Sequence, residues 1–151
     1  MKKLLLLSAL LIFACSSDEG NNDNNNSNQN FLQKYDGVTW YSIGDDPGGA
    51  ADYWITFSPN GFNDCEYYGG DYSGSTVIWG EIIDGEYSNA VIENSPERLV
   101  TETIEVDDDG GSFTYTTTAE ATNNGNSLEV TYSDDVGYIE YYDRVSSNPC
   151  N

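Results

Sequence analysis

The stretch Tyr53-Trp54-Ile55-Thr56-Phe57-Ser58-Pro59-Asn60-Gly61-Phe62 decides the fold of this chain. Its first five residues are all aromatic or β-branched, the side chains that favour a β-strand. In the next four residues, Pro59 supplies a fixed φ and Asn60-Gly61 tolerates positive φ, so a tight turn is expected there. A returning strand should then run from Phe62 to Tyr68, and the stretch as a whole predicts a β-hairpin.

Short strand and turn patterns extend on both sides of this hairpin. Strand patterns occur at residues 37–43, 76–83, 98–106, 112–120, 128–132 and 137–145, with a less regular one at 87–93. Residues 69–75, rich in Gly, Tyr and Ser, are expected to form a loop, and residues 31–35 one helical turn. Eight or nine short antiparallel strands indicate an all-β barrel or sandwich. Their consecutive hairpins favour an antiparallel up-and-down barrel of about eight strands.

The first fifteen residues have the organisation of an export signal. Lys2 and Lys3 precede an apolar run over residues 4–13, which is shorter than the ~20 residues of a membrane-spanning helix but suits a secretory signal. The run ends in Ile12-Phe13-Ala14-Cys15, which resembles the lipobox of bacterial lipoproteins. This resemblance implies cleavage ahead of Cys15 and attachment of acyl chains, palmitate among them, to that cysteine. The alternative is an ordinary signal peptide with a chance cysteine.

Two polar segments follow Cys15. Ser16-Ser17-Asp18-Glu19 resembles the acidic signal that sends Bacteroidetes lipoproteins to the outer face of the outer membrane; the periplasmic face is the alternative. Residues 20–30 are mostly Asn and contain no apolar side chain, so they predict a disordered tether. The expected organisation is a signal peptide at residues 1–14, a lipidated, Asn-rich tether at 15–30 and one β-barrel domain at 31–151.

The chain is strongly acidic. Its formal net charge at pH 7 is −21, and removal of Lys2 and Lys3 with the signal leaves three basic residues against 26 acidic ones, a charge of −23. Such a protein repels phosphate backbones, which excludes nucleic acid as a partner. It has no attraction to lipid headgroups either, so membrane attachment must come from acyl chains. High charge of one sign keeps a tethered domain soluble, and cations or basic partners stay open.

The sequence contains no histidine, and its three cysteines comprise one candidate for lipidation and one candidate pair for a disulfide. Without an imidazole, Ser/His/Asp and Cys/His catalytic arrangements and His-containing zinc sites are excluded. With Cys15 lipidated, Cys65 and Cys150 form an even pair in an oxidising compartment, so we predict one disulfide; two free thiols are the alternative. No Gly-x-Ser-x-Gly motif is present, and acidic residues are too numerous for two neighbours to indicate a glycosidase. We therefore expect neither catalysis nor a cofactor.

Three motifs of the folded part resemble the small lipocalin-like domains of Bacteroidetes lipoproteins. They are Gly37-Val38-Thr39-Trp40, the hairpin at residues 53–62, and Tyr141-Tyr142-Asp143-Arg144-Val145. In lipocalins a basic side chain of the last strand covers a tryptophan of the first strand, and the resemblance assigns these roles to Arg144 and Trp40. A guanidinium over an indole gains ~0.5–2 kcal/mol and closes one end of the barrel. Lipocalins usually have Gly-x-Trp where this chain has Gly-x-x-Trp, which leaves the register of the first strand open.

An eight-stranded barrel either fills with side chains or holds one small ligand. The aromatic residues expected to line a ligand site, by stacking on sugar rings or enclosing an apolar molecule, are Trp54, Phe57, Trp79, Tyr115 and Tyr138. The alternative is that they are packing residues of the core.

Two runs of aspartate are candidates for calcium binding. Asp107-Asp108-Asp109 and Asp45-Asp46 offer the hard oxygen ligands that calcium prefers. Neither run has the spacing of an EF-hand loop, and aspartate is favoured in turns by local hydrogen bonding. No metal site is therefore predicted.

Two functions are compatible with this organisation. The first is a lipid-anchored binding module of the cell envelope whose barrel holds a small apolar molecule or a glycan fragment. The second is a non-enzymatic structural or interaction lipoprotein with a side-chain-filled barrel and a protein partner. A binding barrel must contain an accessible cavity, and a packed barrel must not. In either case we expect a monomer.

Overall fold

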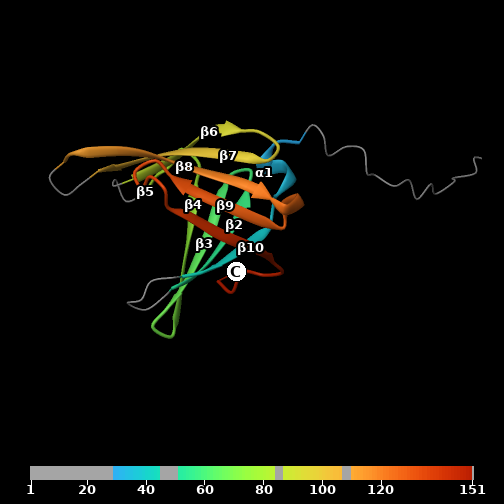
Figure 1. Ribbon diagram of the computed structural model, residues 1–151. Helices are drawn as coiled ribbons and strands as arrows, with labels where there is room; N and C mark the ends of the chain where they lie inside the picture. The colour runs from blue at the N-terminus through green and yellow to red at the C-terminus, as the bar shows by residue number, and fades with distance from the viewer. Residues whose placement is uncertain (1–28, 45–50, 84–86, 107–109, 151) are drawn as a thin grey trace, which may run out of the picture.

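Ten antiparallel strands of the described residues form one sheet that curls into a barrel (Figure 1). The computed structural model describes residues 29–44, 51–83, 87–106 and 110–150. The elements are α1 (Phe31–Lys34), β1 (Thr39–Ile43), β2 (Asp52–Ser58), β3 (Gly61–Tyr68), β4 (Asp71–Ile78), β5 (Ile82–Ile83), β6 (Tyr87–Asn94), β7 (Arg98–Val106), β8 (Ser112–Thr122), the 3₁₀ turn η2 (Asn123–Gly125), β9 (Ser127–Tyr132) and β10 (Ile139–Val145). The predicted all-β, up-and-down barrel is confirmed.

Strands that are consecutive in the chain are also neighbours in the sheet, apart from β4 and β5. The strand order is β4-β3-β2-β1-β10-β9-β8-β7-β6-β5, so the pairing of β1 with β10 joins the first strand to the last, and β4 and β5 form the two edges. Close to these edges, the backbone N–H of Gly80 donates to the carbonyl of Asn89 on β6 at 2.6 Å. The barrel is therefore nearly closed.

The β3–β4 hairpin corrects one expectation. Residues 69–75 do not form a loop, because β4 begins at Asp71 and pairs with β3 along its whole length. Gly69 and Gly70, with φ of 63° and 103°, form the turn between the two strands. Ladder hydrogen bonds to β3 thus outweigh the low strand preference of Gly and Ser. The strand expected at residues 76–83 is split between β4 and β5.

The short helix α1 covers one end of the barrel. The side chain of Asn30 accepts from the backbone N–H of Gln33 at 3.0 Å, and the side chain of Gln33 accepts from the N–H of Asn30 at 3.3 Å, which is a capping box. The N–H of Phe31 donates to the carbonyl of Ser95, in the turn between β6 and β7, at 2.8 Å. These bonds fix α1 across this end, which we call the closed end.

The hydrophobic core lies beneath α1. Trp40 is 0% exposed, and its indole contacts the rings of Phe31, Tyr35 and Phe57 at centroid distances of 6.1, 5.4 and 5.7 Å. Leu128 is also fully buried in this cluster. Burial of each large apolar side chain contributes ~1.5–3 kcal/mol. The closed end is thus filled by side chains.

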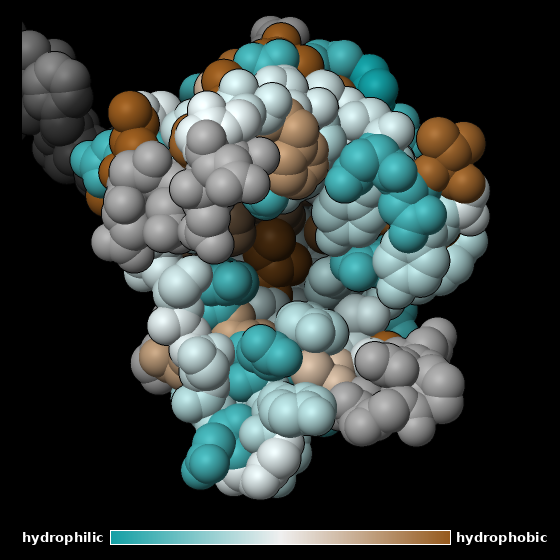
Figure 2. Space-filling view, turned by 90° about the vertical axis from the view of Figure 1, so that its left-hand side faces the viewer, coloured by the Kyte–Doolittle hydropathy of each residue, from teal (hydrophilic) through white to brown (hydrophobic). Residues whose placement is uncertain are grey.

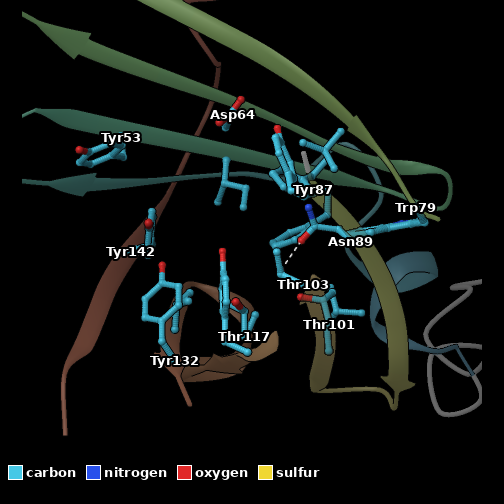
Figure 3. Close-up of a pocket in the computed structure, with 18 of the residues that line it drawn as sticks. Tyr53, Asp64, Trp79, Tyr87, Asn89, Thr101, Thr103, Thr117, Tyr132 and Tyr142 are labelled. Carbon is cyan, nitrogen blue, oxygen red and sulfur yellow. Dashed lines mark hydrogen bonds between the residues drawn. The ribbon is translucent and has the colours of Figure 1, made fainter. Parts of the chain in front are cut away.

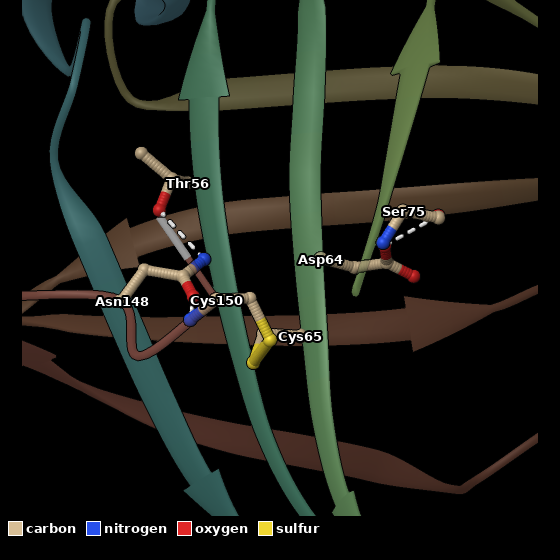
Figure 4. Close-up of a disulfide and its surroundings, with 6 residues drawn as sticks. All are labelled: Thr56, Asp64, Cys65, Ser75, Asn148 and Cys150. Carbon is tan, nitrogen blue, oxygen red and sulfur yellow. Dashed lines mark hydrogen bonds between the residues drawn. A yellow bond between two sulfur atoms is a disulfide. The ribbon is translucent and has the colours of Figure 1, made fainter. Parts of the chain in front are cut away.

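The C-terminal tail crosses the outer face of β2 and β3 and is held there by a disulfide (Figure 4). Cys65 and Cys150 are bridged over a separation of 85 residues, as predicted. Asn148 donates to the hydroxyl of Thr56 at 3.4 Å. A Cβ at Gly74 would lie 2.8 Å from the Cβ of Cys150, so glycine is needed where the tail approaches β4. Closing a loop of this size stabilises the fold by ~4 kcal/mol in the chain-entropy model.

Candidate functional site: a cavity at the open end of the barrel

The barrel contains a cavity of about 390 Å³. Its opening lies away from α1, and Figure 2 shows hydrophobic side chains in its depth and hydrophilic ones around it. We call this open end the mouth. The volume falls in the range of ~300–1,000 Å³ that small-molecule sites occupy.

The two-residue period of β7 shows how the sequence builds the cavity wall. Leu99, Thr101, Thr103 and Glu105 are alternate residues of this strand, and all four line the cavity. The first three are buried, whereas Glu105, nearest the mouth, is partly exposed. Successive side chains of a strand point to opposite faces, so a single strand supplies a graded wall. The wall changes from apolar at the closed end to acidic at the mouth.

A polar band crosses the middle of the cavity (Figure 3). The Thr103 hydroxyl donates to the side-chain carbonyl of Asn89 at 2.6 Å, and both residues are buried. Thr101 and Thr117, which are register partners on β7 and β8, also line the cavity. A hydroxyl has one donor and two acceptor positions, so this band can offer hydrogen bonds to an enclosed molecule.

Tyrosine hydroxyls pair with carboxylates at the mouth. Tyr115 donates to Glu105 at 3.0 Å, and Tyr132 and Tyr142 donate to one oxygen of Glu140 at 2.9 and 2.7 Å. Burial, followed by the charge of Glu140, raises the pKa of Tyr132 and of Tyr142 well above the ordinary tyrosine value. Burial also raises the pKa of Tyr115. The three hydroxyls therefore stay protonated and act as donors at neutral pH.

Four of the five predicted ligand-site aromatics, Trp54, Phe57, Trp79 and Tyr115, are among the residues that line the cavity. Phe57 is buried at the boundary between the cavity and the core cluster. Trp79 lies against Phe62 with ring centroids 5.4 Å apart, and Tyr115 stands at the mouth.

Trp54 and Tyr138 differ from the other three in their placement. Trp54 borders the cavity, but its neighbour Ile55 pairs with the buried Trp40, so the indole of Trp54 points to the outer face. There its ring contacts Tyr41 at 4.9 Å. Tyr138 precedes β10, is 49% exposed and is not one of the residues that line the cavity.

The residues assigned to barrel closure are neighbours. Trp40 on β1 pairs directly with Arg144 on β10. Aromatic rings surround the buried indole, whereas Arg144 is exposed. Among the described residues, the cation found over a ring is Lys34, whose ammonium lies 5.1 Å from the centroid of Tyr35. Closure of this end by Arg144 stays a prediction.

Several predicted features lie outside the described residues. These are the signal peptide, Cys15, most of the tether, and the aspartate runs at residues 45–46 and 107–109. In the described ranges, no three acidic, His or Cys side chains are grouped closely enough to hold a metal ion. Within the same part of the chain, no helix has the length and apolar character needed to cross a membrane.

Sequence reasoning missed several residues of the cavity wall. Tyr53, Tyr132, Tyr142 and Glu105 line the cavity but were not among the predicted site residues. The signal that could have found Glu105 is its even spacing from Leu99 along one strand, which places both on one face. That signal becomes usable only when the inward face of the strand is known.

No known family model matches this chain, and a search of curated proteins finds no match. The geometry of the cavity therefore carries the functional conclusion.

Proposed function

We propose that this protein is a lipid-anchored binding module of the cell envelope whose barrel holds one small apolar molecule or glycan fragment. The observation that carries the proposal is the cavity of about 390 Å³. In the alternative function, a packed barrel would fill this space with side chains, as its closed end does. The anchor is the acylated Cys15, in the outer membrane and facing the cell surface, with the periplasmic face as the alternative.

The lining suits a molecule with an apolar body and a few polar groups. Phe57, Phe62, Leu99 and Val130 offer apolar contact in the depth of the cavity. Removing such surface from water contributes roughly 25 cal/mol per Å². The hydroxyls above them can orient the bound molecule through hydrogen bonds.

The point where the chain enters the barrel supports this role. Residues 29 and 30 lead directly into α1 at the closed end. A tether from Cys15 therefore joins the barrel at the end that α1 covers (Figure 1), while the mouth opens at the other end (Figure 2). An anchored barrel of this design can present its mouth away from the membrane.

The test uses the full chain with Cys15→Ser, purified without detergent, and the neutral fluorescent probe N-phenyl-1-naphthylamine. We expect saturable binding of one probe per barrel. Thr117→Phe places a ring in the cavity and should weaken binding at least about tenfold. Thr116→Phe is the matched control, because Thr116 is adjacent to Thr117 on β8 and faces outward. This variant should bind the probe as the parent does. Circular dichroism must show that both variants are folded.

Two results would overturn the proposal. The first is absence of probe binding by the parent barrel. The second is equal binding by Thr117→Phe and its control, which would place the probe outside the cavity. The anchor is tested separately by fractionation: the unaltered protein should sediment with membranes, and the Cys15→Ser form should be released. Continued membrane attachment of that form would contradict acylation of Cys15.

The alternative function as an interaction lipoprotein is favoured by a row of aromatic rings on the outer face of the sheet. Tyr41, Trp54, Tyr72 and Tyr67 follow one another at centroid distances of 4.9, 6.0 and 4.8 Å. Tyr72 is 57% exposed. A Tyr72→Ser variant that loses a protein partner and keeps N-phenyl-1-naphthylamine binding would support this second function.

A further inference from the structure

The carboxylates of the mouth are bound only by neutral donors in the described part of the chain. Glu105 lines the cavity and accepts from Tyr115. Glu140 accepts from Tyr132 and Tyr142, two residues that line the cavity. Hydroxyl donors orient a carboxylate and stabilise it, but they do not cancel its charge. A negative charge therefore remains on both sides of this tyrosine cluster.

The basic side chains of the described residues are all at the closed end. Lys34 forms an ion pair with Glu97, and Arg98 pairs with glutamates of β6 and β8. Arg144 lies opposite the buried Trp40. None of these three residues lines the cavity. The barrel thus has both charge signs at its closed end and, among the described residues, only carboxylates at its mouth.

Further acidic groups and aromatic rings lie at the mouth. Asp64 lines the cavity, and burial, together with the charges of Glu66 and Glu140, raises the pKa of Tyr53. Tyr53 and Tyr115 line the cavity as well, and aromatic faces attract cations by ~0.5–2 kcal/mol. Rings and carboxylates favour the same sign of ligand charge.

We infer that the cavity selects molecules that combine an apolar or aromatic body with a positive charge, such as an amine or a guanidine. This inference rests on the proposed binding function and names its ligand class. The body lies against Phe57, Leu99 and Val130, and the charged head lies at the mouth near Glu105 and Glu140. A carboxylate ligand such as a fatty acid would place its charge beside these two glutamates and is disfavoured.

Three probes with one naphthalene body test this selection. They are 2-(1-naphthyl)ethylamine, which is cationic at pH 7, the neutral 2-(1-naphthyl)ethanol and the anionic 1-naphthylacetate. Binding to the Cys15→Ser chain is measured by calorimetry at about 0.15 M salt, where distant surface charges are largely screened. We expect the amine to bind at least about tenfold more tightly than the alcohol, because hydrogen bonds to charged groups are stronger than neutral ones. The acid should bind most weakly.

Variants that replace one glutamate with uncharged glutamine locate the source of the charge selection. Glu105→Gln and Glu140→Gln should each reduce the affinity for the amine about tenfold and leave that for the alcohol within about twofold. Glu102→Gln is the matched control, since Glu102 lies on the same strand as Glu105 but on its outer face. It removes the same charge from the protein and should leave the affinity for the amine unchanged.

The outcomes separate this inference from the proposed function. Equal binding of amine and alcohol would overturn charge selection, while the alcohol and N-phenyl-1-naphthylamine would still demonstrate a binding cavity. An equal loss of amine affinity in Glu102→Gln and Glu105→Gln would overturn it too, because the attraction would then come from the overall charge of the protein. Failure of every probe, including N-phenyl-1-naphthylamine, would overturn the proposed function itself.

Discussion

The closed end and the mouth are built from the same strands but have opposite interiors. At the closed end, Phe31, Trp40 and Leu128 are each 0% exposed, and their packing leaves no room for a ligand. At the mouth, Tyr53 is 41% exposed and stands beside an open cavity. Along β7 the inward residues change from the apolar Leu99 to the acidic Glu105. The buried core therefore lies at one end of the sheet and the open cavity at the other.

The two ends also treat charge differently. At the closed end, carboxylates such as Glu97 and Glu120 form ion pairs with Lys34 and Arg98. At the mouth, Glu105 accepts only from the hydroxyl of Tyr115 among the hydrogen bonds of the described residues. Ion pairs therefore balance these carboxylate charges at the closed end. Glu105 and Glu140 have no basic partner in the described part of the chain.

The largest expected effect comes from truncating matched aromatic residues of β2 at the two ends. Phe57 and Tyr53 both face inward and are four residues apart, but Phe57 is 4% exposed and Tyr53 is 41% exposed. Phe57→Ala should cost ~3–5 kcal/mol of unfolding free energy, because it leaves a hole in the core cluster. Tyr53→Ala should cost about 1 kcal/mol or less. Urea denaturation of both variants measures the difference, and equal losses would contradict the division between the ends.

The next effect concerns pH and arises at the mouth. The pKa of Tyr132 and that of Tyr142 are raised in the folded protein by burial and by Glu140. Above the ordinary tyrosine pKa of about 10, the unfolded chain loses these protons while the folded chain keeps them, so stability falls as pH rises. Each tyrosine contributes a slope of at most about 1.4 kcal/mol per pH unit. Below that pH the contribution is constant.

Urea midpoints measured from pH 8 to pH 11 test this slope. A Tyr132→Phe, Tyr142→Phe double variant should show a shallower decline above pH 10 than the parent. Tyr68→Phe is the control, because Tyr68 is 58% exposed and its replacement should leave the slope unchanged. An identical decline in the parent and the double variant would show that these two hydroxyls are not the source.

The fold could be predicted from the sequence because its signals are local. The hairpin at residues 53–62, the alternation of residues 128–132 and the turn at Asn123–Gly125 each depend on a few adjacent residues. The wrong loop at residues 69–75 shows the limit. Gly74 disfavours a strand by itself, yet it is the residue that admits Cys150 against β4, a contact with a distant part of the chain.

The site could be predicted only in part, because its members are set by register. Phe57, Trp79 and Tyr115 were found by residue type, since aromatic residues are common in binding sites. Trp54 has the same type but lies in the opposite phase of β2, and phase is fixed by the pairing of Ile55 with Trp40. Side-chain type indicates which contacts a residue can make, whereas strand pairing decides which face of the sheet the residue occupies.

The smallest expected effect concerns the closure of the closed end. Arg144 pairs with Trp40 in the β1–β10 ladder, but Phe31, Tyr35 and Phe57 surround the indole. Arg144→Met keeps an unbranched apolar stem and removes the charge, so it should change the unfolding free energy by less than about 0.5 kcal/mol. Lys34→Met, the control, removes a cation that pairs with Glu97 and lies over Tyr35, and should cost up to about 1 kcal/mol. Urea midpoints of both variants decide the matter. A loss of 1–2 kcal/mol for Arg144→Met would show that a cation over Trp40, rather than the aromatic cluster alone, closes this end of the barrel.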